Sequence, residues 1–78
     1  MRVLLDENIP RQLKRCFPSG VCVETVPERG WSGMKNGELL HTASREFNIF
    51  ISMDLGISYQ QNLHSLQIGV ILLSATSN

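Results

Sequence analysis

The chain has 78 residues, of which 42% are hydrophobic and 18% charged, and its formal net charge is zero. These values predict one small globular domain over residues 1–78. They argue against a chain-wide electrostatic attraction to nucleic acid, although a local basic patch is compatible with them. The sequence shows no signal peptide and no apolar run of transmembrane length, so we expect a cytoplasmic protein without membrane association.

The first predicted strand is the apolar run Val3-Leu4-Leu5, which is typical of a strand covered on both faces. Three side chains with hydrogen-bond acceptors follow it directly, namely Asp6, Glu7 and Asn8. The spacing of apolar residues then predicts a helix over residues 10–17. The acceptors therefore stand at the carboxyl end of a strand, the edge at which open α/β sheets bind ligands.

The rest of the chain alternates strand and helix patterns. We expect strands at residues 21–26, 49–53 and 68–73, a helix that begins near residue 36 and another over 57–66. Such alternation predicts an α/β fold with a four-stranded parallel sheet and right-handed crossovers. The last strand is strongly apolar and no closing helix follows it. We expect a partner chain to cover it, or the domain to be short at its C-terminus.

Soft metal ligands are few in this sequence. Cys16 and Cys22 show no metal-binding spacing, and we expect two buried thiols, with a disulfide as the alternative. His41 and His64 fall on predicted polar helix faces, and neither is spaced with another ligand. A metal site built from cysteine and histidine is therefore not expected.

Three basic residues lie close together in the first predicted helix. Arg11, Lys14 and Arg15 are on or near one face of it. A solvated helix face and a local basic patch are both compatible with this pattern.

The functional hypothesis rests on three carboxylates. Asp6 ends the first predicted strand, Asp54 ends the third, and Glu38 opens the helix between the second and third strands. Helices of a parallel sheet begin near the edge at which the strands end, so these three carboxylates can meet there. Mg²⁺ prefers oxygen ligands, and a bound ion can activate a water for attack on a phosphodiester. Asn8 adds a neutral oxygen, and Ser52 adds a hydroxyl beside the site.

Each of these residues also has a purely structural interpretation. Asp6 and Asp54 each precede a predicted helix, so either can be a helix cap. Glu38 falls in a first helical turn, where a carboxylate interacts favourably with the helix dipole. Ser52 can satisfy the local backbone of its strand.

Several segments of the chain together form the pattern of a known family. They are the opening Val3-Leu4-Leu5-Asp6-Glu7-Asn8-Ile9-Pro10, the middle segments Glu24-Thr25-Val26, Gly30-Trp31-Ser32-Gly33 and Asn36-Gly37-Glu38-Leu39-Leu40, and the later segments Phe50-Ile51-Ser52-Met53-Asp54 and Gly69-Val70-Ile71-Leu72-Leu73. This pattern resembles the small PIN-like family DUF5615, which is related to VapC toxins. The resemblance covers nearly the whole chain, and its most specific part is the Asp-Glu-Asn-x-Pro opening.

The resemblance implies a PIN-like α/β/α sandwich with ribonuclease activity that depends on Mg²⁺ or Mn²⁺. Many PIN-type proteins are toxins neutralised by a small antitoxin, and many form homodimers. Asp6 and Asp54 match acidic site positions of the family, and Glu38 matches an acidic position at the start of the second helix. This chain departs from the family at Gly56, where a second Asp is usual, and at Asn36, where an Asp is frequent.

We therefore expect a PIN-like toxin of a toxin–antitoxin system that cleaves RNA by metal-assisted hydrolysis. Asp6, Glu38 and Asp54 are the expected catalytic and metal-binding residues, with Asn8 and Ser52 in support. The expected cofactor is Mg²⁺ or Mn²⁺, and the expected partners are RNA, a cognate small antitoxin and a second copy of the chain. The alternative is a catalytically inactive PIN-like interaction module that binds an antitoxin-like partner or self-associates.

Overall fold

The computed structural model describes residues 1–54, 56–57 and 66–74. Within these residues the elements are the strands β1 (Arg2–Leu5), β2 (Cys22–Thr25), β3 (Ile49–Ser52) and β4 (Gly69–Leu72), the 3₁₀ helix η1 (Arg11–Cys16) and the α-helix α1 (Asn36–Ala43). The strands form one sheet in the order β2-β1-β3-β4, and every neighbouring pair is parallel. The predicted four-stranded parallel sheet of an α/β fold is therefore confirmed. No helix in the described part of the chain is long and apolar enough to cross a membrane.

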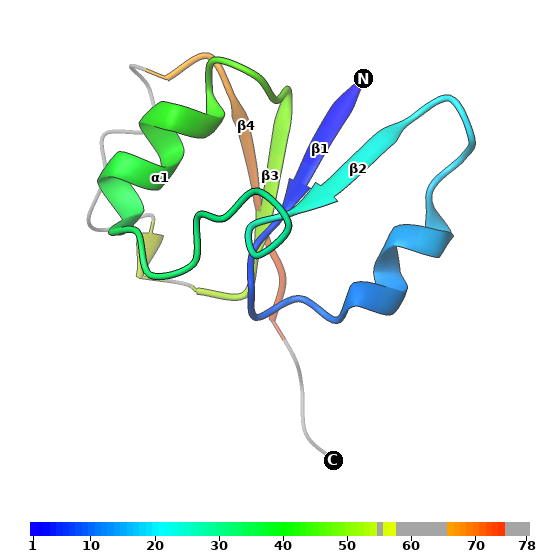
Figure 1. The fold of residues 1–78 in the computed structure, drawn as a ribbon, viewed down its shortest axis with the longest axis horizontal. Helices are drawn as coiled ribbons and strands as arrows, with labels where there is room; N and C mark the ends of the chain where they lie inside the picture. The colour runs from blue at the N-terminus through cyan, green and yellow to red at the C-terminus, as the bar shows by residue number, and fades with distance from the viewer. Residues whose placement is uncertain (55, 58–65, 75–78) are drawn as a thin grey trace.

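The strand order brings the ends of β1 and β3 together in the middle of the sheet. Leu5 of β1 is in register with Thr25 of β2 and with Ile51 of β3. The backbone N–H of Asp6 continues this ladder by donating to the carbonyl of Ile51 at 2.9 Å. Figure 1 shows that the strands run in one direction and that α1 and η1 lie on opposite sides of the sheet.

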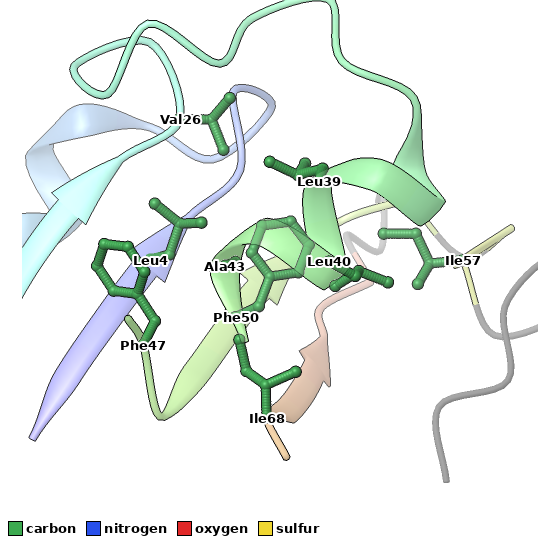
Figure 2. Packing of buried hydrophobic residues seen from close by; sticks show 9 residues of the cluster. All are labelled: Leu4, Val26, Leu39, Leu40, Ala43, Phe47, Phe50, Ile57 and Ile68. Carbon is green, nitrogen blue, oxygen red and sulfur yellow. The ribbon is translucent and has the colours of Figure 1, made fainter. Parts of the chain in front are cut away.

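The main hydrophobic core lies between the sheet and α1. Figure 2 shows α1 over the sheet, with the buried residues of this core between them. They are Leu4, Val26, Leu39, Leu40, Ala43, Phe47, Phe50, Ile57 and Ile68. The helix expected to begin near residue 36 is confirmed as α1, and its residues Leu39, Leu40 and Ala43 are buried. Phe50 and Leu40 are completely buried, so the sheet and the helix share one tightly packed layer.

A smaller core lies on the opposite face of the sheet. Its buried residues are Val3, Leu5, Ile9 and Ile51, with the half-buried Leu13 and Phe17 of the η1 segment packed against them. This face is less well covered at β4, where Ile71 is 43% exposed and Leu73, directly after the strand, is 39% exposed. Apolar side chains are thus left exposed at β4 on this face, and their coverage by a partner chain stays a prediction.

Two local expectations differ from the structure, and a third falls largely outside the described residues. The helix expected over residues 10–17 is a 3₁₀ helix over Arg11–Cys16, and none of its own residues is buried. The apolar residues near it are too few to bury a full α-helical stripe. Cys16 and Cys22 are exposed free thiols rather than buried ones, since η1 buries none of its residues and Cys22 begins the edge strand β2. The helix expected over 57–66 lies largely outside the described residues.

The loop between β2 and α1 is held in a defined path. The N–H of Trp31 bonds to the carbonyl of Val26 at 3.0 Å. The Trp31 ring meets the Phe47 ring edge-on, with the ring centroids 6.1 Å apart. Gly30 and Gly33 adopt φ values of +75° and +87°, a region in which other L-residues are strained. The loop thereby delivers the first residue of α1 to the carboxyl edge of the sheet.

Candidate functional site

The candidate site lies at the carboxyl ends of the two central strands. Asp6 directly follows β1, Ser52 is the last residue of β3, and Asp54 comes two residues later. Because β1 and β3 are hydrogen-bonded neighbours, these three residues meet at one point of the sheet edge. Ligands of open parallel sheets bind at this edge.

Asp6 is 7% exposed, and its carboxylate accepts hydrogen bonds from two donors. Its Oδ2 accepts a hydrogen bond from the Ser52 hydroxyl at 2.6 Å. Its Oδ1 accepts a hydrogen bond from the backbone N–H of Glu7 at 2.8 Å. A carboxylate has four lone-pair sites, so these two bonds fix the orientation of Asp6 and leave it able to accept further donors or a cation.

Asp54 is joined to the same network through Ser52. Its backbone N–H donates to Ser52 Oγ at 2.9 Å, so one buried hydroxyl connects the two acidic residues. The Asp54 carboxylate accepts the N–H of Gly56 on Oδ1 at 3.0 Å and the side-chain amide of Asn36 on Oδ2 at 3.1 Å. The network therefore spans the ends of β1 and β3 and the first turn of α1.

The structure distinguishes between the two interpretations of Asp6, a helix cap and a carboxylate of the site. Helix η1 begins at Arg11, its N-cap is Pro10, and that cap makes no side-chain hydrogen bond. Asp6 therefore does not cap this helix, and its buried carboxylate is turned toward Ser52 instead. Asp54 accepts the N–H two residues ahead of it, which is the geometry of an Asx turn.

Two other predicted site residues lie in different surroundings. Asn8 is exposed, and its Oδ1 accepts the backbone N–H of Met53 at 3.2 Å, which ties the loop after β1 to the end of β3. Glu38 is exposed in the first turn of α1. Among the described residues, no three or more His, Cys, Asp or Glu side chains are close enough together to hold a metal ion. Asp6, Glu38 and Asp54 are therefore not assembled as a set of three metal ligands.

Asn36 is the member of the network that sequence reasoning missed. The sequence predicted a helix that begins near this residue, and α1 begins at Asn36 with its N-cap at Lys35. The side-chain amide of Asn36 donates a hydrogen bond to the Asp54 carboxylate. The sequence signal that could have identified Asn36 as a site residue is its position in the first turn of a helix that begins at the carboxyl edge of the sheet.

The carboxylate oxygens of Asp6 and Asp54 are of the kind that binds a hard cation. Mg²⁺ is commonly held by one or two carboxylates and keeps several waters, so it does not need a cage of protein ligands. Carboxylates that bind metals are usually held by hydrogen bonds from neighbouring groups. Ser52 and Asn36 donate such bonds to Asp6 and Asp54, respectively. The geometry thus supplies two oriented carboxylates at a sheet edge, with Asn8 beside them.

No protein-family model matches the chain, and comparisons with curated proteins and with solved structures found no match either.

Proposed function

We propose that this protein is a PIN-like ribonuclease that uses a divalent cation, Mg²⁺ or Mn²⁺, to hydrolyse RNA phosphodiesters. The observation that carries the proposal is the link from Asp6 through the Ser52 hydroxyl to Asp54 at the ends of adjacent parallel strands. The sequence resemblance to PIN-like proteins supports the same activity.

The roles of the residues follow from their contacts. Asp6 and Asp54 would hold the cation, which would polarise a phosphoryl oxygen and activate a water for in-line attack. Ser52 and Asn36 keep the two carboxylates oriented before substrate arrives, which lowers the cost of reorganisation during the reaction. Glu38 lies at the same end of α1 as Asn36 and would contact the cation only through a water or orient the attacking water.

We further propose that the protein acts as the toxin of a toxin–antitoxin pair in the cytoplasm. The support is the sequence resemblance to the family related to VapC toxins. A cognate small antitoxin would then bind the chain and restrain the cleavage of RNA.

The test is calorimetric titration of Mn²⁺ into the purified protein, followed by incubation with RNA. Wild type is expected to bind Mn²⁺ saturably and to cleave RNA, and Asp54→Asn and Asp6→Asn are expected to lose both properties. The matched control is Glu7→Gln, which removes an exposed carboxylate next to Asp6 and should bind Mn²⁺ like wild type. Cleavage and Mn²⁺ binding that survive in the Asp6→Asn, Asp54→Asn double variant would refute the proposal.

A second candidate is a catalytically inactive interaction module. The observation that favours it is the apolar surface at β4, where Ile71 and Leu73 are 43% and 39% exposed. Edge strands are usually protected by charges or proline, but β4 reads Gly-Val-Ile-Leu. Gly56 also stands where the family usually has a second carboxylate.

Such a module would bind an antitoxin-like protein or a second copy of the chain through β4. Light scattering after size-exclusion chromatography distinguishes it, because Ile71→Lys would convert a dimer to a monomer. A monomeric wild type that binds Mn²⁺ would count against this candidate.

A further inference from the structure

A cavity beside η1 concentrates much of the positive charge of this neutral chain. Its volume is about 410 Å³, and it is lined by Arg11, Gln12, Lys14, Arg15 and Glu28. The chain has seven Lys and Arg residues in total. Three of them line this one cavity, so the zero net charge hides a local positive field.

The carboxylate in the cavity is already occupied by Lys14. The ammonium of Lys14 contacts both carboxylate oxygens of Glu28, at 2.9 and 3.0 Å. Glu28 Oε1 also accepts the backbone N–H of Thr25 at 3.0 Å. Hydrogen bonds from Lys14 and then Thr25 lower the pKa of Glu28, so this group is ionised at neutral pH and paired. The cavity keeps an excess of two positive charges, which belong to Arg11 and Arg15.

Arg11 and Arg15 are exposed, and within the described part of the chain neither takes part in an ion pair. Arg2 and Arg29 differ, because both pair with the carboxylates of Glu24 and Glu46. A guanidinium presents a planar set of donors that matches the oxygens of a phosphate. The two arginines of the cavity are thus available for an anionic ligand of this geometry.

The cavity is close to the candidate cation site along the chain. The N–H of Ile9 bonds to the carbonyl of Asp6, and the N–H of Leu13 bonds to that of Pro10, both at 3.0 Å. The first of these turns shortens the path from Asp6 to Arg11, whose Cα atoms can be at most about 18 Å apart across five residues. A short length of nucleic acid backbone can therefore reach from one to the other.

We propose that the η1 cavity, through Arg11 and Arg15, binds the phosphate backbone of single-stranded RNA and leads the strand to the edge at Asp6 and Asp54. This inference rests on the proposed function, because it assigns the binding surface for the RNA that the cation site would cleave. The contacts are to phosphates, so they contribute affinity without sequence preference.

The test is anisotropy of a labelled oligouridine of ten nucleotides, titrated with protein in EDTA over a range of salt concentrations. Each phosphate contact to single-stranded nucleic acid contributes about 0.7 to the salt slope, or about fivefold in affinity at 0.1 M salt. Arg11→Gln and Arg15→Gln should each lower the slope and the affinity by about these amounts. Glu28→Gln should strengthen binding, because it removes the negative charge from the cavity.

The matched control is Arg45→Gln, which removes one exposed positive charge just beyond the C-terminal end of α1. Because α1 begins at the carboxyl edge and ends at the opposite edge, Arg45 lies away from the cavity, and its variant should leave the slope unchanged. The inference is overturned if wild type fails to bind the oligouridine, or if Arg45→Gln weakens binding as much as Arg11→Gln and Arg15→Gln do.

The experiments distinguish a failure of this inference from a failure of the proposed function. RNA binding that depends on Arg11 and Arg15, without cleavage in Mn²⁺, would support the cavity and refute the ribonuclease. Cleavage that needs Asp6 and Asp54 but is unchanged in both arginine variants would refute the cavity and support the ribonuclease.

Discussion

The hydroxyl of Ser52 donates a 2.6 Å hydrogen bond to Oδ2 of Asp6. The Oγ of Ser52 also accepts a hydrogen bond from the backbone N–H of Asp54 at 2.9 Å. A completely buried serine thus connects two acidic residues that are 48 positions apart in the sequence. This relationship exists only because β1 and β3 are neighbours in the sheet. The first prediction follows from it.

Ser52→Ala should destabilise the protein by about 1–3 kcal/mol, because a buried acceptor loses its donor. The same variant should weaken Mn²⁺ binding, since Asp6 loses the bond that orients it. Urea unfolding and calorimetry check the two effects. The control is Ser44→Ala, which removes a hydroxyl at the end of α1 that donates to the carbonyl of His41. Equal stability losses in the two variants would contradict the special role of Ser52.

Asn36→Asp should make the stability of the protein more dependent on a divalent cation. The amide that donates to Asp54 is replaced by a third carboxylate, which repels Asp54 without a cation and attracts one when it is present. The rise in melting temperature on adding Mn²⁺ should therefore be larger than in wild type. Asn36→Ala serves as the control, because it removes the same donor and adds no charge. If the two variants respond alike to Mn²⁺, Asn36 does not lie beside a cation site.

Leu40→Ala should cost about 2–5 kcal/mol of unfolding free energy, because it opens a cavity in the core beneath α1. Small domains of this kind have only about 5–15 kcal/mol in total, so this variant should be close to unfolding at room temperature. Leu73→Ala is the matched control at a residue that is 39% exposed. Urea unfolding of both variants checks the prediction, and a larger loss for Leu73→Ala would contradict this assignment of the core.

The ion pair between Lys14 and Glu28 predicts a pH dependence of stability. The hydrogen bond from Lys14 lowers the pKa of Glu28 below its ordinary value of 4.5. The resulting stabilisation is present above the unfolded pKa and is lost as the pH falls through the lower folded value. Both side chains are partly exposed, at 33% and 47%, so solvent limits the contribution to about 1 kcal/mol or less.

Glu28→Gln should therefore be less stable than wild type at pH 7, and the difference should shrink below the ordinary pKa of 4.5 and vanish once the pH is below the lowered pKa of the folded state. Unfolding midpoints in urea across this range measure it. Glu7→Gln is the control, because Glu7 is exposed and should show no such convergence. A stability difference for Glu28→Gln that persists in acid would mean that lost packing, not the ion pair, causes the effect.

Much of the fold was predictable from local patterns. The apolar run before Asp6 and the β-branched segments predicted the strands, and their alternation with helical spacing predicted parallel pairing, as observed. The start of α1 near residue 36 was predicted correctly because burial against a sheet requires apolar residues at helical spacing, and Leu39, Leu40 and Ala43 follow at that spacing. By contrast, η1 was mistaken for an α-helix, since the spacing of a few apolar residues over two turns does not separate the two helix types.

The sequence by itself determined where the carboxylates of Asp6 and Asp54 stand, namely at the ends of strands, because strand boundaries follow from local composition. Only the tertiary structure decided their partners. The bond from Ser52 to Asp6, the donation from Asn36 to Asp54 and the exposure of Ile71 all depend on which strands and helices become neighbours. Such contacts join residues far apart in the chain, and local patterns carry no information about them.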